Sequence, residues 1–147
     1  MKRAIIMVIV FAITLSMSVI TTSAGTSNQQ AASNGIIEIE PFWVNTNSIV
    51  LGITYSGTTA SCSGRIRGNS NVNSITATFT LRRVNSNGTL TTVRTWSGLS
   101  SNTSSLNFSG THSSVSSGQT YRLDVTATLT TTSGVRETVS QSFTRAY

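Results

Sequence analysis

The sequence has 147 residues, and its ten Lys and Arg against four Asp and Glu give it a formal net charge of +6. A chain of this length corresponds to one ordinary domain and can bury a core without the help of metal ions. Its single cysteine, Cys62, excludes a disulfide within the monomer.

Residues 1–24 have the features of a cleaved signal peptide. Two basic residues follow Met1, residues 4–20 are mostly apolar, and the small residues Thr22 and Ala24 suit positions −3 and −1 of a cleavage site. A membrane anchor is the alternative, but the apolar stretch is short for a span and no cationic cluster follows it. We therefore expect a secreted protein, with cell-surface association left open and no membrane span after cleavage.

Residues 25–41 are predicted to be a flexible leader. Residues 25–35 are small and polar, with nothing to bury. Residues 36–40 alternate weakly and stop at Pro41, which suits an edge strand or an extended lead-in.

Residues 42–147 are predicted to form one all-β domain with about seven strands. Short segments alternate apolar and polar residues with a period of two, and Gly, Asn and Ser separate them. Asn87-Gly88 predicts a hairpin turn. This spacing favours an antiparallel two-sheet sandwich, and a closed barrel such as a jelly roll or an OB-fold is the alternative. The predicted strands cover residues 48–55, 59–68, 75–81, 90–96, 106–108, 121–129 and 135–143.

Two sets of residues resemble known proteins. The segment 115–125, which contains Gly118 and Tyr121, is similar to the approach into strand F of immunoglobulin and fibronectin-III domains. The resemblance implies that the Tyr121 hydroxyl bonds to backbone upstream, although Leu123 stands where an antibody domain has its second cysteine. A second resemblance is to an uncharacterised family of small secreted Gram-positive bacterial β-sandwich proteins, and it covers roughly residues 43–147. It is carried by segments 60–66, 78–81 and 93–96 and by the strand that contains Tyr121. That resemblance implies an immunoglobulin/fibronectin-III-like fold and no particular activity.

The residues that could support catalysis are poorly placed for it. His112 is predicted to lie in a Ser-rich loop, and a triad would need a buried acid, whereas Asp124 is predicted to face outward beside Arg122. Glu38 and Glu40 lie two residues apart on the lead-in, where they cannot enclose a sugar. The sequence therefore predicts a protein that is not an enzyme, with no catalytic residues, no metal site and no cofactor.

Several residues are predicted to serve packing. Cys62 alternates with Ala60 and Gly64 on an inward face, which indicates a buried and inert thiol. Trp43 and Trp96 are expected to pack against the core, although a carbohydrate-stacking platform is the alternative. The residues assigned a structural role are Cys62, Tyr121, Trp96, Phe79 and Leu123.

The arginines are the candidate binding residues. The chain after residue 24 keeps eight arginines and no lysine, which favours an anionic cell-envelope polymer or a protein as partner. Arg65 and Arg67 share one outward strand face, and Arg82 and Arg122 are expected to project into solvent from the other sheet. Ordinary solubility and edge protection are the alternative reading of these charges. Nucleic acid is not expected as a partner, because no aromatic residues alternate with the basic ones.

The sequence thus predicts a non-enzymatic secreted binding or surface-interaction module. A structural protein that self-associates along exposed strand edges is the alternative, and a secreted hydrolase is the least favoured possibility.

Overall fold

The computed structural model of this protein describes residues 36–39 and 43–147, which form eight strands. The predicted signal peptide, Glu40 and the side chain of Glu38 lie outside the described residues. Over the described ranges, the structure contains no helix long and apolar enough to cross a membrane. The strands are β1 (Ile36–Ile39), β2 (Thr46–Ser56), β3 (Thr59–Gly68), β4 (Val72–Val84), β5 (Leu90–Ser101), β6 (Ser105–Ser113), β7 (Thr120–Thr131) and β8 (Arg136–Ala146).

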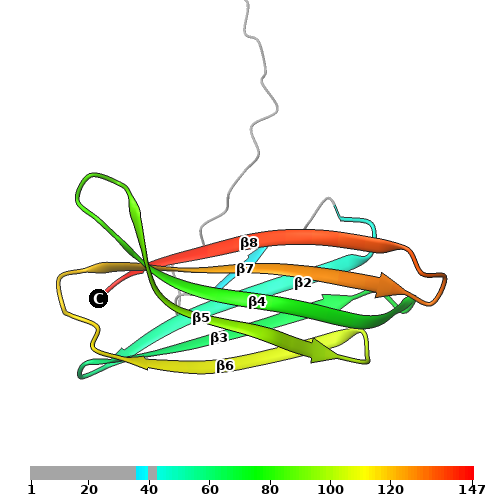
Figure 1. The fold of residues 1–147 in the computed structure, drawn as a ribbon, viewed down its shortest axis with the longest axis horizontal. Coiled ribbons are helices and arrows are strands. Elements are labelled where there is room, and N and C mark those ends of the chain that lie inside the picture. Colours follow the sequence, from blue (N-terminus) through cyan, green and yellow to red (C-terminus); the bar gives the residue numbers. More distant parts are fainter. Residues whose placement is uncertain (1–35, 40–42) are drawn as a thin grey trace, which may run out of the picture.

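The strands form two antiparallel sheets that pack face to face (Figure 1). One sheet has the order β1-β2-β3-β6 and the other has the order β5-β4-β7-β8. No ladder of paired strands joins the two sheets in the part of the chain that the structure describes. The predicted all-β two-sheet sandwich is therefore confirmed, and the closed barrel is wrong. The seven strands predicted within residues 42–147 correspond to β2–β8, and β1 is the edge strand expected in the lead-in.

Alternation with a period of two builds the core. Every second residue is buried along β7, from Ala60 to Ile66 of β3 and from Ile75 to Leu81 of β4, and these inward faces meet between the sheets. Ile66, Phe79, Leu123 and Leu129 all have exposed fractions of 0%. Each such side chain contributes about 1.5–3 kcal/mol of burial free energy. A slip of one residue would turn the whole set toward solvent, so this pattern determines which residues face outward.

The hairpin of β4 and β5 projects from one end of the sandwich (Figure 1). Its turn contains the predicted Asn87-Gly88 pair. The Gly88 N–H donates to the Asn85 carbonyl at 2.9 Å, and Gly88 has a φ of 80°, which glycine adopts without steric cost. The pairing of β4 with β5 shifts register twice, between Ala77 and Phe79 and between Leu81 and Arg82. β5 continues to Ser101, beyond the predicted residues 90–96.

The prediction for β6 was wrong in its extent. The strand continues past Phe108 to Ser113, so His112 lies in a strand opposite Ala60 and not in a loop. The apolar alternation that marks a strand ends at Phe108 because Gly110 takes the next position. A Cβ at Gly110 would lie 2.7 Å from the Phe108 ring and 2.8 Å from the Trp96 ring. Position 110 therefore requires glycine, and the alternation of apolar and polar residues stops there although the strand continues.

Aromatic rings fill the space between β4, β5 and β6. The Phe79 and Phe108 rings stack at a centroid distance of 4.1 Å, and Trp96 tilts against Phe108 at 5.2 Å. Both Trp96 and Trp43 are partly buried against the core. Phe79 and Trp96 therefore both lie in aromatic packing contacts with Phe108.

Tyr121 stands at the beginning of β7 and is 3% exposed. Its hydroxyl accepts a hydrogen bond of 3.0 Å from the Ser116 N–H, five residues upstream. This is the backbone contact that the resemblance to strand F implies. Leu123, two residues later, is fully buried and fills core volume in place of a disulfide.

Candidate functional site

Arg82 of β4 and Arg122 of β7 lie directly opposite each other on the outer face of the β5-β4-β7-β8 sheet. Their inward neighbours Leu81 and Leu123 are buried, so the alternation turns both arginines outward. Asp124 follows Arg122 by two residues and therefore lies on the same face. Cross-strand register thus assembles two cations and one anion from residues that are up to 42 positions apart in the chain.

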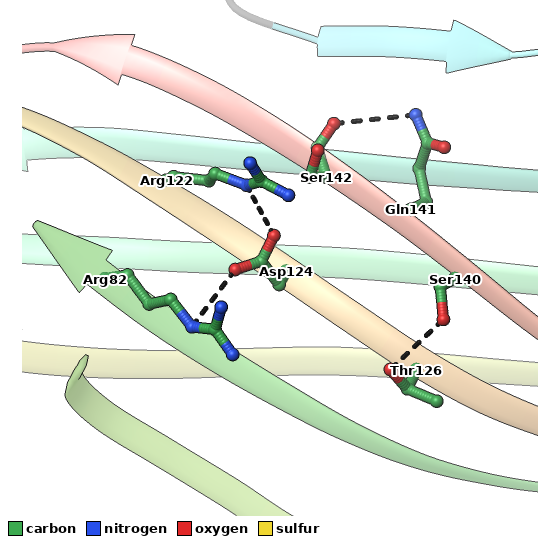
Figure 2. Close-up of polar contacts among 7 residues, drawn as sticks. All are labelled: Arg82, Arg122, Asp124, Thr126, Ser140, Gln141 and Ser142. Atoms are coloured by element: carbon green, nitrogen blue, oxygen red, sulfur yellow. Dashed lines mark hydrogen bonds and ion pairs between the residues drawn. The ribbon is translucent and has the colours of Figure 1, made fainter. Parts of the chain in front are cut away.

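The carboxylate of Asp124 lies between the two guanidinium groups (Figure 2). Arg122 Nε donates to Asp124 Oδ1 at 2.6 Å, and Arg82 Nε lies 3.4 Å from Oδ2. The arginine side chains are 38% exposed and the Asp124 side chain is 18% exposed. Both arginines point to the outer face as expected, and their ion pairs with Asp124 hold the Nε atoms close to the carboxylate.

The charges of this cluster, which we call the Arg-Asp-Arg cluster (Arg82, Asp124, Arg122), do not balance. Like charges directly opposite each other on neighbouring strands destabilise a sheet, and one carboxylate offsets only one of the two cations. No further acidic side chain contacts either arginine in the described part of the chain. Arg122 donates a hydrogen bond from Nε, whereas Arg82 Nε approaches the carboxylate as an ion pair without a hydrogen bond. In the described part of the chain, the terminal nitrogens of both arginines therefore keep donors for a ligand. The cluster therefore presents a surplus of one positive charge.

Hydroxyl groups surround this charge. A shallow, open hollow of about 310 Å³ borders Arg82, Arg122 and Asp124, and Thr126, Ser140 and Ser142 line it as well. Thr126 and Ser140 lie opposite each other with their hydroxyls 3.2 Å apart (Figure 2). A second hollow of about 280 Å³ lies further along the same sheet and is lined by further Thr and Ser residues. The lining of both hollows contains no aromatic side chain.

Arg65 and Arg67 lie on β3, on the outer face of the opposite sheet. Both are exposed, and Arg65 Nε donates to Asn107 Oδ1 of β6 at 3.0 Å. The core separates this face from the Arg-Asp-Arg cluster, so the four predicted arginines form two surfaces. No acidic side chain pairs with Arg65 or Arg67 in the described residues, and they supply two separate exposed charges.

The groups considered for catalysis do not meet. His112 lies on β6 and Asp124 on β7, in different sheets, and the Asp124 carboxylate is engaged by two arginines. Cys62 is 1% exposed, and burial raises the pKa of its thiol to about 11, which suppresses the reactive thiolate. Among the described residues, no group of three His, Cys, Asp or Glu side chains could hold a metal ion. The predicted Glu38 and Glu40 pair lies outside the described side chains.

Glu137 has a role that the sequence analysis missed. Its carboxylate accepts hydrogen bonds from the Val44 N–H at 2.7 Å, from the Asn45 N–H at 3.1 Å and from the Thr46 hydroxyl at 2.9 Å. The carboxylate thereby fixes the start of β2 to β8 across the two sheets. The inward position of Glu137, opposite buried Leu129, was the available signal, because an acid on an inward strand face requires hydrogen-bond donors.

No protein-family model matches this chain, and no curated protein matches it either. The resemblance to small secreted Gram-positive proteins therefore stays a prediction.

Proposed function

We propose that this chain is an exported, non-enzymatic binding module that holds an anionic polymer on the outer face of the β5-β4-β7-β8 sheet. The observation that carries the proposal is the surplus positive charge of the Arg-Asp-Arg cluster, where two arginines face each other across neighbouring strands. Such a pair opposes sheet stability unless an anion compensates it. A bound polymer would supply the second anion.

The proposal includes an immunoglobulin/fibronectin-III-like sandwich. If β2 is counted as strand A, the sheets have the orders A-B-E and C′-C-F-G, with β5 beside β4 as C′ lies beside C in variable-type domains. The bond from the Ser116 N–H to the Tyr121 hydroxyl supports the same assignment, because a tyrosine corner occurs near the start of strand F. Modules of this kind bind ligands through sheet faces or loops. The flat, polar outer face of the β5-β4-β7-β8 sheet suits ligand binding of this kind.

Self-association along the β5 edge has less support. β5 is an edge strand of its sheet, but its two register shifts and the positive φ of Gly98, 71°, interrupt the regular row of hydrogen-bonding groups. Bulges of this kind protect edges against the addition of another strand.

The test compares variants of matched charge. Arg82→Gln/Asp124→Asn/Arg122→Gln removes the three charges of the cluster while keeping polar side chains at these positions, and it lowers the net charge by one. Arg67→Gln on the opposite outer face lowers the net charge by the same amount. In calorimetric titrations with polyanions, the triple variant should lose at least ten-fold in affinity and Arg67→Gln less than two-fold. Wild-type binding should also weaken steeply between 50 and about 200 mM salt, because salt screens exposed charges. Equal losses in the two variants, or binding that salt does not affect, would contradict the proposal.

A further inference from the structure

The outer face of the β5-β4-β7-β8 sheet carries a row of hydroxyl groups that begins at the Arg-Asp-Arg cluster. The register pairs Asp124 with Ser142, Thr126 with Ser140, and Thr128 with Thr138. The hydroxyls of the last two pairs lie 3.2 Å apart. Each hydroxyl can donate once and accept twice, so these pairs keep hydrogen-bonding capacity for a ligand.

A third cation ends the row. Arg136 pairs with Thr130, which by alternation lies on the same outer face as Thr126 and Thr128, and Arg136 is exposed. Six residues of extended strand separate Ser142 from Arg136, which corresponds to about 20 Å. The face therefore offers two positive sites at the ends of an uncharged hydroxyl track, which we define as Thr126, Thr128, Thr138 and Ser140. A linear ligand with repeated negative charges and hydroxyl groups fits this arrangement better than a single small anion.

The track offers no platform for sugar rings. Pyranose rings pack their apolar faces against aromatic side chains, and the two hollows on this sheet are lined without any. Trp96, the nearest candidate by strand, packs inward against Phe108. A polymer of charged sugar rings would thus lose its main apolar contact, whereas an acyclic chain needs only charge and hydroxyl partners.

The face is also poorly suited to insertion into a membrane. In the described part of the chain, the large exposed apolar side chains are Val44 and Val135, and both lie outside the strands of this sheet. Peripheral binding to a bilayer draws much of its affinity from buried apolar area, which this surface does not supply.

We propose that the polymer is an acyclic polyol linked by phosphodiesters, which runs along β7 and β8 from the Arg-Asp-Arg cluster to Arg136. This inference rests on the proposed function and narrows its ligand class. A phosphodiester carries one negative charge, which equals the surplus charge of the cluster. The terminal nitrogens of Arg82 and Arg122 can donate to its non-bridging oxygens, since guanidinium groups match the geometry of phosphate. The polyol hydroxyls then pair with the track.

The experiment titrates the full secreted chain with soluble poly(glycerol phosphate), polygalacturonate, dextran sulfate and phosphatidylglycerol vesicles at equal charge concentration. We expect poly(glycerol phosphate) to bind at least ten-fold more tightly than the other three. Thr126→Val/Thr128→Val/Thr138→Val removes three hydroxyls while keeping β-branched side chains, and it should weaken poly(glycerol phosphate) binding about five- to ten-fold. The control Thr54→Val/Thr111→Val alters two exposed threonines of the other sheet and should leave binding within two-fold. Thermal melts will verify that every variant is folded.

Arg136→Gln provides a second readout that does not depend on the threonines. It should reduce the slope of log affinity against log salt by about one, because one counterion-releasing contact is lost. An unchanged slope would contradict the proposal that the polymer lies along the hydroxyl track as far as Arg136. Tighter binding of polygalacturonate, dextran sulfate or vesicles than of poly(glycerol phosphate) would contradict it as well. Equal, salt-dependent binding of all the polyanions would overturn the ligand class and leave the proposed function standing. If none of these ligands bound in a salt-dependent way, both the ligand class and the proposed function would be wrong.

Discussion

The ring of Phe79 lies directly against the backbone of Gly64, so that a Cβ at position 64 would overlap the ring. The contact joins β3 of one sheet to β4 of the other at the centre of the core. Gly64→Ala should therefore destabilise the fold by about 1–3 kcal/mol through overpacking. Urea unfolding followed by tryptophan fluorescence measures this, with Ser61→Ala on the exposed face of the same strand as the control. Equal unfolding midpoints for the two variants would contradict the tight contact.

Tyr121→Phe tests the hydrogen bond at the start of β7. The variant keeps the ring and leaves the Ser116 N–H without its acceptor, so we expect a loss of about 1–3 kcal/mol in the free energy of unfolding. Leu123→Ala should cost more, about 2–5 kcal/mol, because it leaves a cavity in the core. If Tyr121→Phe left the free energy of unfolding unchanged while Leu123→Ala lowered it strongly, the assignment of β7 would stand. The hydrogen bond from the Ser116 N–H to the Tyr121 hydroxyl would then contribute nothing to stability.

Glu137→Gln tests the carboxylate that fixes the start of β2. The amide keeps one acceptor oxygen and loses the charge, so the bonds to Val44, Asn45 and Thr46 weaken. Charge-assisted bonds contribute about 1.5–3 kcal/mol, and we expect a destabilisation at the lower end of that range. Hydrogen exchange should speed up selectively at the Val44 and Asn45 amides. The neighbouring Arg136→Gln serves as the control, and equal exchange in the two variants would argue against the contact.

Asp124→Asn tests how the arginine pair is held. The variant leaves two opposed cations without a carboxylate, so its Tm should fall at low salt and partly recover as salt screens the repulsion. Adding Arg122→Gln to Asp124→Asn removes the repulsion and should restore most of the lost stability. Failure of the second substitution to rescue the first would show that Asp124 stabilises the sheet by something other than charge balance.

The buried thiol of Cys62 should make the fold less stable at alkaline pH. Burial raises the pKa of the folded thiol from 9.0 to about 11, so the unfolded chain loses its proton first. The protonated thiol thus contributes on the order of 2 kcal/mol to the free energy of unfolding. This contribution is fully present below pH 9 and is lost as the pH rises to about 11. Cys62→Ala should show a flatter dependence of unfolding free energy on pH across this window. Burial also raises the pKa of Tyr55, to about 12, and that residue is unchanged in the variant.

Thiol labelling at pH 8 offers a separate check of the same site. The native protein should react with a thiol reagent at least a hundred times more slowly than the protein in urea, because Cys62 is 1% exposed and protonated. Fast labelling of the native protein would mean that β3 opens readily.

The sequence by itself determined the strands and their faces, because a side-chain period of two is a local property of the chain. The inward positions of Cys62, Phe79 and Leu123 followed from their neighbours, and so did the outward positions of Arg65, Arg67, Arg82 and Arg122. The pattern failed where it was interrupted, as at Gly110, which hid the second half of β6 and placed His112 wrongly in a loop.

Only the tertiary structure decided which outward and inward groups meet. Strand order and register place Arg82 opposite Arg122 with Asp124 beside them, and they bring Glu137 to Val44, 93 residues away. Pairing across a sheet depends on turn geometry, bulges and the fit of two faces at the core, which alternation along one strand does not contain. For that reason the sequence indicated arginines that face solvent, and the fold turned two of them into a charged cluster beside a row of hydroxyls.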